Sequence, residues 1–155
     1  MLADIYTNLF EIYILYSQEP IWKKIWPKFK KHISEPFEKN LSKLTWDKKE
    51  NESINNTLLR SLCISYLGFV EDKNTINHSI SLLKNPNTID SEISGAVYFT
   101  IANNSPENYK KILETYLNPP SLEEKVKLLN SIYRFKNEKI IKQALELSLS
   151  DKIRL

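Results

Sequence analysis

The sequence predicts an all-α protein in which antiparallel helix pairs stack as a HEAT-like or ARM-like α-α superhelix. Apolar residues recur at helical spacing along most of the chain. The 155 residues include only 2 glycines, fewer than the tight turns of a β-rich protein usually need. From residue 54 onward the predicted helices come in pairs, which begin near residues 54, 91 and 121. This quasi-repeat of roughly 30–40 residues is typical of helical solenoids.

The predicted organisation is one helical domain over residues 1–155. Leading helices occupy 1–46 and three helix pairs occupy 53–155, and the polar run DKKENE at 47–52 separates them. A length of 155 residues suits a single domain, because about 100–200 residues is the usual size. The net charge of +3 permits acidic partners without requiring them.

The first predicted helix covers residues 3–18 and ends at Glu19-Pro20. Its apolar side chains spread over more than one face, so we expect it to be buried on more than one side. These side chains are Ile5, Tyr6, Leu9, Phe10, Ile12, Tyr13, Ile14 and Tyr16.

Residues 21–45 combine helically spaced aromatic residues with lysines, and we expect Pro27 and Pro36 to kink or break this helix. One interpretation is a basic, aromatic surface for nucleic acid or acidic lipid. The other is a helix whose aromatic side packs inward while its lysines remain in solvent. We favour the second, because the apolar residues share a face and Glu35 and Glu38 dilute the charge. The apolar residues are Trp22, Ile25, Trp26, Phe29 and Ile33, and the lysines are Lys23, Lys24, Lys28, Lys30 and Lys31.

Three helix pairs are predicted after the polar loop, each with an apolar stripe. Ser121 and Glu124 have the spacing of a capping box at the start of the third pair, and Asn137 is a suitable N-cap for its second helix. The first pair carries Leu58, Leu59, Leu62, Tyr66 and Leu67, then Ile76, Ile80, Leu82 and Leu83. The second carries Ile93, Ala96, Val97, Thr100 and Ile101, then Tyr109, Ile112, Leu113, Tyr116 and Leu117. The third carries Leu122, Val126, Leu129 and Ile132, then Ile140, Ile141, Ala144, Leu145 and Leu149.

The chain shows no pattern that builds an active site by itself, so we expect no catalytic residue, metal or cofactor in it. Its two histidines, His32 and His78, are far apart, and no H-E-x-x-H zinc motif is present. No glycine-rich phosphate loop occurs either. The single cysteine, Cys63, lies in an apolar run, which predicts a buried thiol in a reducing compartment, here the cytoplasm. No apolar run approaches the ~18–20 residues that span a membrane.

Several short patterns, in order, resemble the C-terminal helical domain of M1-family zinc aminopeptidases, above all the puromycin-sensitive, endoplasmic-reticulum and tricorn-interacting members. They are the Leu-Arg pair Leu59-Arg60, the Ala-Val-Tyr run Ala96–Tyr98, the E-K-x-x-L-L run Glu124–Leu129 and the acid-x-[IV]-R run Asp151–Arg154. The stretch LYSQEPIWKKIWPKF and LTWD at 44–47 also resemble the segment that leads into this domain. The resemblance covers essentially the whole chain.

The resemblance implies a non-catalytic part of an aminopeptidase. In that family the helical domain forms a curved bowl that covers the active site and helps to accept peptides. The zinc motif and the Gly-x-Met-Glu-Asn motif belong to other domains, so zinc would belong to a catalytic domain outside this chain. The expected partners are therefore that catalytic domain or a peptide substrate, with no membrane. The chain is interpreted as a fragment of the larger C-terminal domain.

Two other functions compete with this interpretation. A free-standing HEAT-like scaffold would bind a protein partner on its concave face. A nucleic-acid binder would rely on Lys23–Lys31 alone and is the weaker alternative. We also expect apolar surface near residues 3–16 and 140–155, where it would promote docking or self-association, most commonly as a twofold homodimer.

Arg134 is the candidate site residue. It follows the helix that begins at Ser121, so a simple role is to interact with the helix C-terminus. The resemblance implies that turns of this region face the peptide chamber, where an arginine could hold the C-terminal carboxylate of a peptide. Tyr98 and Tyr133 are candidates to line the same surface, although core positions suit them better.

Overall fold

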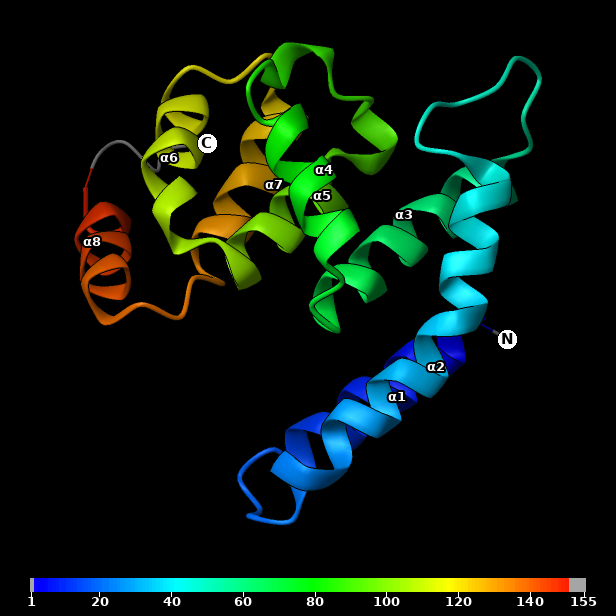
Figure 1. Cartoon of the computed structure of the whole chain (residues 1–155). Coiled ribbons are helices and arrows are strands. Elements are labelled where there is room, and N and C mark those ends of the chain that lie inside the picture. The colour runs from blue at the N-terminus through cyan, green and yellow to red at the C-terminus, as the bar shows by residue number, and fades with distance from the viewer. Residues whose placement is uncertain (1, 151–155) are drawn as a thin grey trace.

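The computed structural model describes residues 2–150, and within this range every regular element is a helix (Figure 1). This confirms the all-α prediction. The α-helices are α1 (Leu2–Tyr16), α2 (Trp22–Leu44), α3 (Ile54–Phe69), α4 (Lys73–Leu82), α5 (Ser91–Asn104), α6 (Tyr109–Leu117), α7 (Leu122–Ile132) and α8 (Glu138–Ser148). Two short 3₁₀ helices, η1 (Pro86–Thr88) and η2 (Pro106–Asn108), lie before α5 and α6.

Helices α3, α5 and α7 form the central layer of the molecule, with α5 packed between the other two. Helix α4 packs on α5 and α6 packs on α7, while α2 covers α3. Consecutive helix pairs therefore stack on one another, as in an α-α superhelix. Most fully buried side chains belong to this layer and its neighbours, among them Ile64, Val97, Ile101, Ile112 and Leu128.

Helices α3 and α5 approach each other closely at Gly68. A Cβ atom added there would overlap the Thr100 side chain, whose own Cβ would be 2.8 Å away. The Asn104 amide donates a hydrogen bond of 2.8 Å to the Gly68 carbonyl, and the Thr100 hydroxyl donates one of 3.4 Å to the Ile64 carbonyl. The missing side chain at Gly68 thus permits the contact between the two helices.

Polar side chains cap most of these helices, and the predicted caps Ser121 and Asn137 are confirmed. The side-chain oxygen of the residue before each helix accepts a backbone N–H from its first turn. These N-caps are Ser53, Asp72, Asp90, Ser121 and Asn137. Only half of the predicted capping box forms, because the Glu124 carboxylate points into the core instead of returning to Ser121. It accepts hydrogen bonds of 2.7 Å from the Ser94 hydroxyl and 3.1 Å from the Tyr98 hydroxyl.

Helix α2 runs without interruption through both of its prolines. Of the two expected outcomes, a kink or a break, the structure shows a kink, visible as a change of direction along α2 (Figure 1). Helix α1 packs against α2 through aromatic contacts, with the Tyr13 ring 5.2 Å from the Trp26 ring. Lys23, Lys24, Lys28 and Lys31 are exposed, while the half-buried Lys30 pairs with Glu71 at 2.9 Å. The aromatic side of α2 therefore packs inward while most of its lysines remain in solvent, as expected.

Apolar side chains remain exposed on the outer helices. On α1 and the turn after it they are Ile5, Ile14, Leu15, Tyr16 and Ile21, and on α8 and its C-cap they are Ile141, Leu145 and Leu149. The predicted apolar stripe of α7 is partly wrong, since Leu122 and Val126 are exposed while Leu128 is fully buried. Residues 151–155, which include the resembling run Asp151–Arg154, lie outside the described residues.

A buried ion pair fixes the loop between α2 and α3. Arg60 donates hydrogen bonds of 2.7 and 2.6 Å from Nη2 to the two Glu52 oxygens. It also donates to the backbone carbonyls of Thr45, at 2.9 Å, and Leu44, at 3.2 Å. The Arg60 guanidinium lowers the pKa of Glu52, mainly through these hydrogen bonds. The arginine of the Leu-Arg pattern therefore has a structural role.

Candidate functional site

Arg134 stands in the turn that follows α7. Its backbone N–H donates a hydrogen bond of 3.0 Å to the Ser131 carbonyl. Its side chain is exposed and lies over the Phe99 ring, with the guanidinium carbon 4.9 Å from the ring centroid. Among residues 2–150 no carboxylate comes within ion-pair distance of it. The cation is thus positioned by an aromatic ring and keeps its hydrogen-bond donors available.

Two adjoining pockets, of 440 and 310 Å³, meet at this guanidinium and share Phe10, Phe99 and Arg134. We call them together the Arg134 groove. The larger pocket is also lined by Tyr6, Ser65, Gly95, Lys127, Asn130 and Ser131. The smaller is also lined by Tyr13, Ile14, Phe69, Asn103, Tyr133 and Lys136. Residues from α1, α3, α5 and α7 therefore converge on one surface.

Helix α5 presents a single line of residues to the groove. Nearly all its side chains from Ile93 to Ala102 are buried, while Gly95, Phe99 and Asn103 are half-buried at a spacing of four. Helix α1 supplies the opposite wall, where the Phe10 ring lies 5.4 Å from the Phe69 ring in an edge-on contact. The floor of the groove is accordingly aromatic and held by helix packing.

The charge of the groove is positive. Lys127 donates to the Glu123 and Glu124 carboxylates at 2.7 and 3.0 Å, and these bonds raise its pKa against the opposing effect of partial burial. Arg134 has no such partner among residues 2–150. Burial raises the pKa of the Tyr6 hydroxyl, and the nearby Arg134 charge opposes this shift. Lys136 also lines the groove and has no ion-pair partner among these residues, but Arg134 is the cation that lies over an aromatic ring of the groove.

The structure brings together two of the three candidate site residues. Tyr133 is 48% exposed and lines the groove beside Arg134. Tyr98 does not reach the surface, because it is fully buried and donates to Glu124. The residue that faces the groove is its neighbour, Phe99. The spacing of four residues between Gly95, Phe99 and Asn103 indicates in the sequence that they share one face of the helix. The contribution of Phe10 to the groove depends on how α1 packs, which the sequence does not show.

A carboxylate and an apolar side chain suit this groove in combination. The planar guanidinium can donate two parallel hydrogen bonds to a carboxylate. The adjacent rings of Phe10, Phe69 and Phe99 offer an apolar surface. Both groups occur together at the C-terminus of a peptide.

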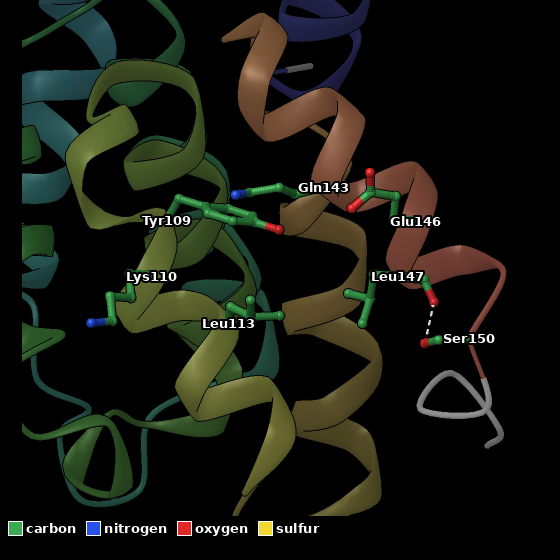
Figure 2. A pocket seen from close by; sticks show the side chains of 7 residues that line it. All are labelled: Tyr109, Lys110, Leu113, Gln143, Glu146, Leu147 and Ser150. Atoms are coloured by element: carbon green, nitrogen blue, oxygen red, sulfur yellow. Dashed lines mark hydrogen bonds between the residues drawn. The ribbon is translucent and has the colours of Figure 1, made fainter.

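Another pocket, of 480 Å³, lies between α6 and α8 (Figure 2). Leu113 and Leu147 extend into it from the two helices, and Tyr109 reaches across from α6 toward α8 (Figure 2). The Tyr109 hydroxyl is buried without a hydrogen-bond partner, and burial raises its pKa. Lys110 and Glu146 give the lining one charge of each sign. This balance offers no preference for an anion or a cation.

Residues 2–150 contain no metal-binding cluster and no helix that could span a membrane, and their cysteine is buried. No group of three or more His, Cys, Asp or Glu side chains in this range is arranged to hold a metal ion. None of the described helices is long and apolar enough to cross a membrane. Cys63 is fully buried, as predicted, and burial raises the pKa of its thiol to about 11. A thiol in such surroundings is unreactive.

These features define a helical module with a basic, aromatic groove. The profile of the ERAP1-like C-terminal domain matches residues 1–155, the whole chain. The chain therefore belongs to this family and is a C-terminal domain of the M1 aminopeptidase type, which confirms the resemblance seen in the sequence. A search of curated proteins found no match.

Proposed function

We propose that this domain covers the active site of an M1-type zinc aminopeptidase and helps to accept its peptide substrates. Its partner would be a catalytic domain that carries the zinc. The buried thiol of Cys63 suits a reducing compartment, and we assign the protein to the cytoplasm. The observation that carries the proposal is the exposed, unpaired cation of Arg134 at the centre of an aromatic groove.

In this proposal Arg134 binds the C-terminal carboxylate of the peptide while its N-terminus is at the zinc. The guanidinium is held over Phe99 at 4.9 Å, so little ordering is needed when the carboxylate arrives. Phe10 and Phe69 would contact the last side chain of the substrate. The groove would then favour peptides with a free C-terminus and an apolar last residue.

The test replaces Arg134 in an assembled enzyme that contains this domain. We expect Arg134→Ala to lower kcat/KM for peptides with a free C-terminus by about tenfold, which corresponds to ~1.4 kcal/mol. The same peptides with an amidated C-terminus, and small chromogenic aminoacyl substrates, should be cleaved at unchanged rates. Arg134→Lys should recover only part of the loss, because lysine does not form the paired hydrogen bonds.

Lys139 provides a matched control, because it is an exposed cation five residues further on that does not line the groove. Lys139→Ala should leave all three substrate types unaffected. Equal losses on free and amidated peptides, or no loss on either, would leave Arg134 with only its role at the end of α7 and would contradict the proposed contact.

A free-standing scaffold that binds a protein partner is the second candidate. The exposed apolar line of Ile141, Leu145 and Leu149 favours it, because such a face is suited to contact another protein or a second copy. Leu145→Glu would abolish association through this face. Sedimentation of the wild-type chain as a monomer at high concentration, unchanged by Leu145→Glu, would contradict self-association.

A further inference from the structure

A separate pocket, of 560 Å³, lies where the end of α2 meets α4. It shares no residue with the Arg134 groove. We call it the Trp46 pocket. It is lined by Glu38, Leu41, Ser42, Thr45, Trp46, Leu67, Asp72, Asn74, Thr75 and His78. Its volume falls in the usual range of ~300–1,000 Å³ for specific binding sites.

An aromatic pair forms one wall of the Trp46 pocket. The rings of Trp46 and His78 have centroids 4.1 Å apart and an interplanar angle of 37°. Trp46 is half-buried, His78 is exposed and both line the pocket, so part of this pair borders its open space. An accessible indole face attracts cations and planar groups.

The Arg60–Glu52 ion pair holds this wall in place. Arg60 donates to the carbonyls of Leu44 and Thr45, directly before Trp46. Thr45 adopts a left-handed backbone conformation with φ of 62°, which is unfavourable for a β-branched residue. Such a conformation persists only where surrounding contacts determine it, and the buried arginine provides them. The backbone that carries the indole is therefore fixed before any ligand arrives.

The Trp46 pocket is acidic in a chain of net charge +3. Glu38 and Asp72 line it, and no lysine or arginine does. Asp72 accepts the Thr75 N–H through Oδ2, at 2.7 Å, which leaves its other oxygen available. Glu38 has no ion-pair partner among residues 2–150. The charges thus select a cation.

We propose that the Trp46 pocket binds an arginine side chain of a protein partner. The guanidinium would stack on Trp46 and donate paired hydrogen bonds to the Glu38 carboxylate, with Asp72 adding charge. Arginine fits better than lysine because its plane can stack and its donors form a fork. This contact is independent of the Arg134 groove, so it can be tested whether or not the proposed peptide contact exists.

The experiment titrates the full ¹⁵N-labelled chain with the tripeptide acetyl-Gly-Arg-Gly-amide and follows the indole N–H signals by NMR. Trp46→Leu assigns the Trp46 signal among the three tryptophans. We expect a saturable shift of this signal with wild-type protein. The same tripeptide with citrulline in place of arginine has the same shape without the charge and should bind at least tenfold more weakly. The tripeptide with lysine in place of arginine should bind with intermediate affinity.

Variants then test the carboxylates without removing the wall. Glu38→Gln should weaken the arginine peptide about three- to tenfold, and Asp72→Asn should weaken it less while keeping the helix cap. Glu35→Gln, on the same helix but outside the pocket, should have no effect. Absence of a saturable shift, equal binding of the arginine and citrulline peptides, or indifference to Glu38→Gln would overturn the proposal. Equal binding of the lysine peptide would overturn the choice of arginine.

Discussion

Helices α5 and α8 show how differently two predicted amphipathic helices are used. Helix α5 has 14 residues, of which 8 are buried, while α8 has 11 residues, of which only Ile140 and Ala144 are buried. The sequence assigns five apolar stripe residues to each. The two helices differ in how many residues they bury because of their neighbours, and α5 packs against three helices, α3, α4 and α7.

The comparison shows that an apolar residue at helical spacing is buried only where another element covers it. On α8 the stripe splits, so that Ile140 and Ala144 face the protein while Ile141, Leu145 and Leu149 face outward. In a stacked helical array each unit depends on the units beside it. The stability of the domain should therefore be concentrated in its central layer, whereas its outer helices offer surface for binding.

The largest expected effect contrasts a leucine of α7 with one of α8. Leu128 is fully buried, whereas Leu145 is 59% solvent-exposed. Leu128→Ala should lower the free energy of unfolding by about 2–5 kcal/mol, because it leaves a cavity in the core. Leu145→Ala should change it by less than about 0.5 kcal/mol. Urea denaturation of both variants measures the difference.

Equal destabilisation by these two substitutions would contradict the comparison. It would mean that the outer face of α8 is packed in solution, for example against a second copy of the chain. Repeating the denaturation at several protein concentrations would identify that case, since a dimer becomes more stable as concentration rises.

A smaller effect is expected for the buried carboxylate that links α5 to α7. Glu124 accepts from the Ser94 and Tyr98 hydroxyls inside the protein, and burial is the main reason that the pKa of Tyr98 is raised. Glu124→Ala leaves both hydroxyls without this acceptor and should destabilise the domain by about 1–3 kcal/mol. Glu123→Ala is the control, because its side chain is 71% exposed and the expected loss is under ~0.5 kcal/mol.

A double variant tests whether the carboxylate acts through Tyr98. Combining Glu124→Ala with Tyr98→Phe should destabilise the protein by less than the sum of the two single losses, because the phenylalanine no longer needs an acceptor. Strict additivity, or an equal loss from Glu123→Ala, would show that the hydrogen bonds across α5 and α7 contribute little.

Much of the fold could be predicted because it depends on local chemistry. Helical periodicity gave the helix order, and the short polar side chains of Ser121 and Asn137 gave correct helix starts. These signals act within a few residues, so the sequence alone displays them. The position of Arg134 in a turn was likewise predictable, since the preceding helix ends at Ile132.

What could not be predicted depends on contacts between distant segments. The Glu124 side chain does not complete the capping box with Ser121. It instead accepts hydrogen bonds in the core from Ser94 and Tyr98, about one helix pair earlier in the chain. Tyr98 is turned into the core, where it donates to Glu124, and Phe99 lines the groove with Phe10 of α1. Helix α2 continues through Pro27, next to which the Trp26 ring packs on Tyr13 of α1. Periodicity reports how strongly a face is apolar, but the face that another helix covers is decided by tertiary packing.

The smallest expected effect contrasts the two glycines, which lie on adjacent helices. A methyl group at Gly68 would overlap Thr100, while one at Gly95 would meet only the Lys127 side chain at 3.8 Å. Overpacking lowers the free energy of unfolding by about 1–3 kcal/mol, and replacing a helical glycine by alanine raises it by about 1 kcal/mol. Gly68→Ala should therefore destabilise by up to ~2 kcal/mol, whereas Gly95→Ala should stabilise by up to ~1 kcal/mol. Thermal unfolding of the two variants would show opposite shifts, and a shift to higher Tm for both would mean that α3 and α5 can separate at Gly68 without loss of packing.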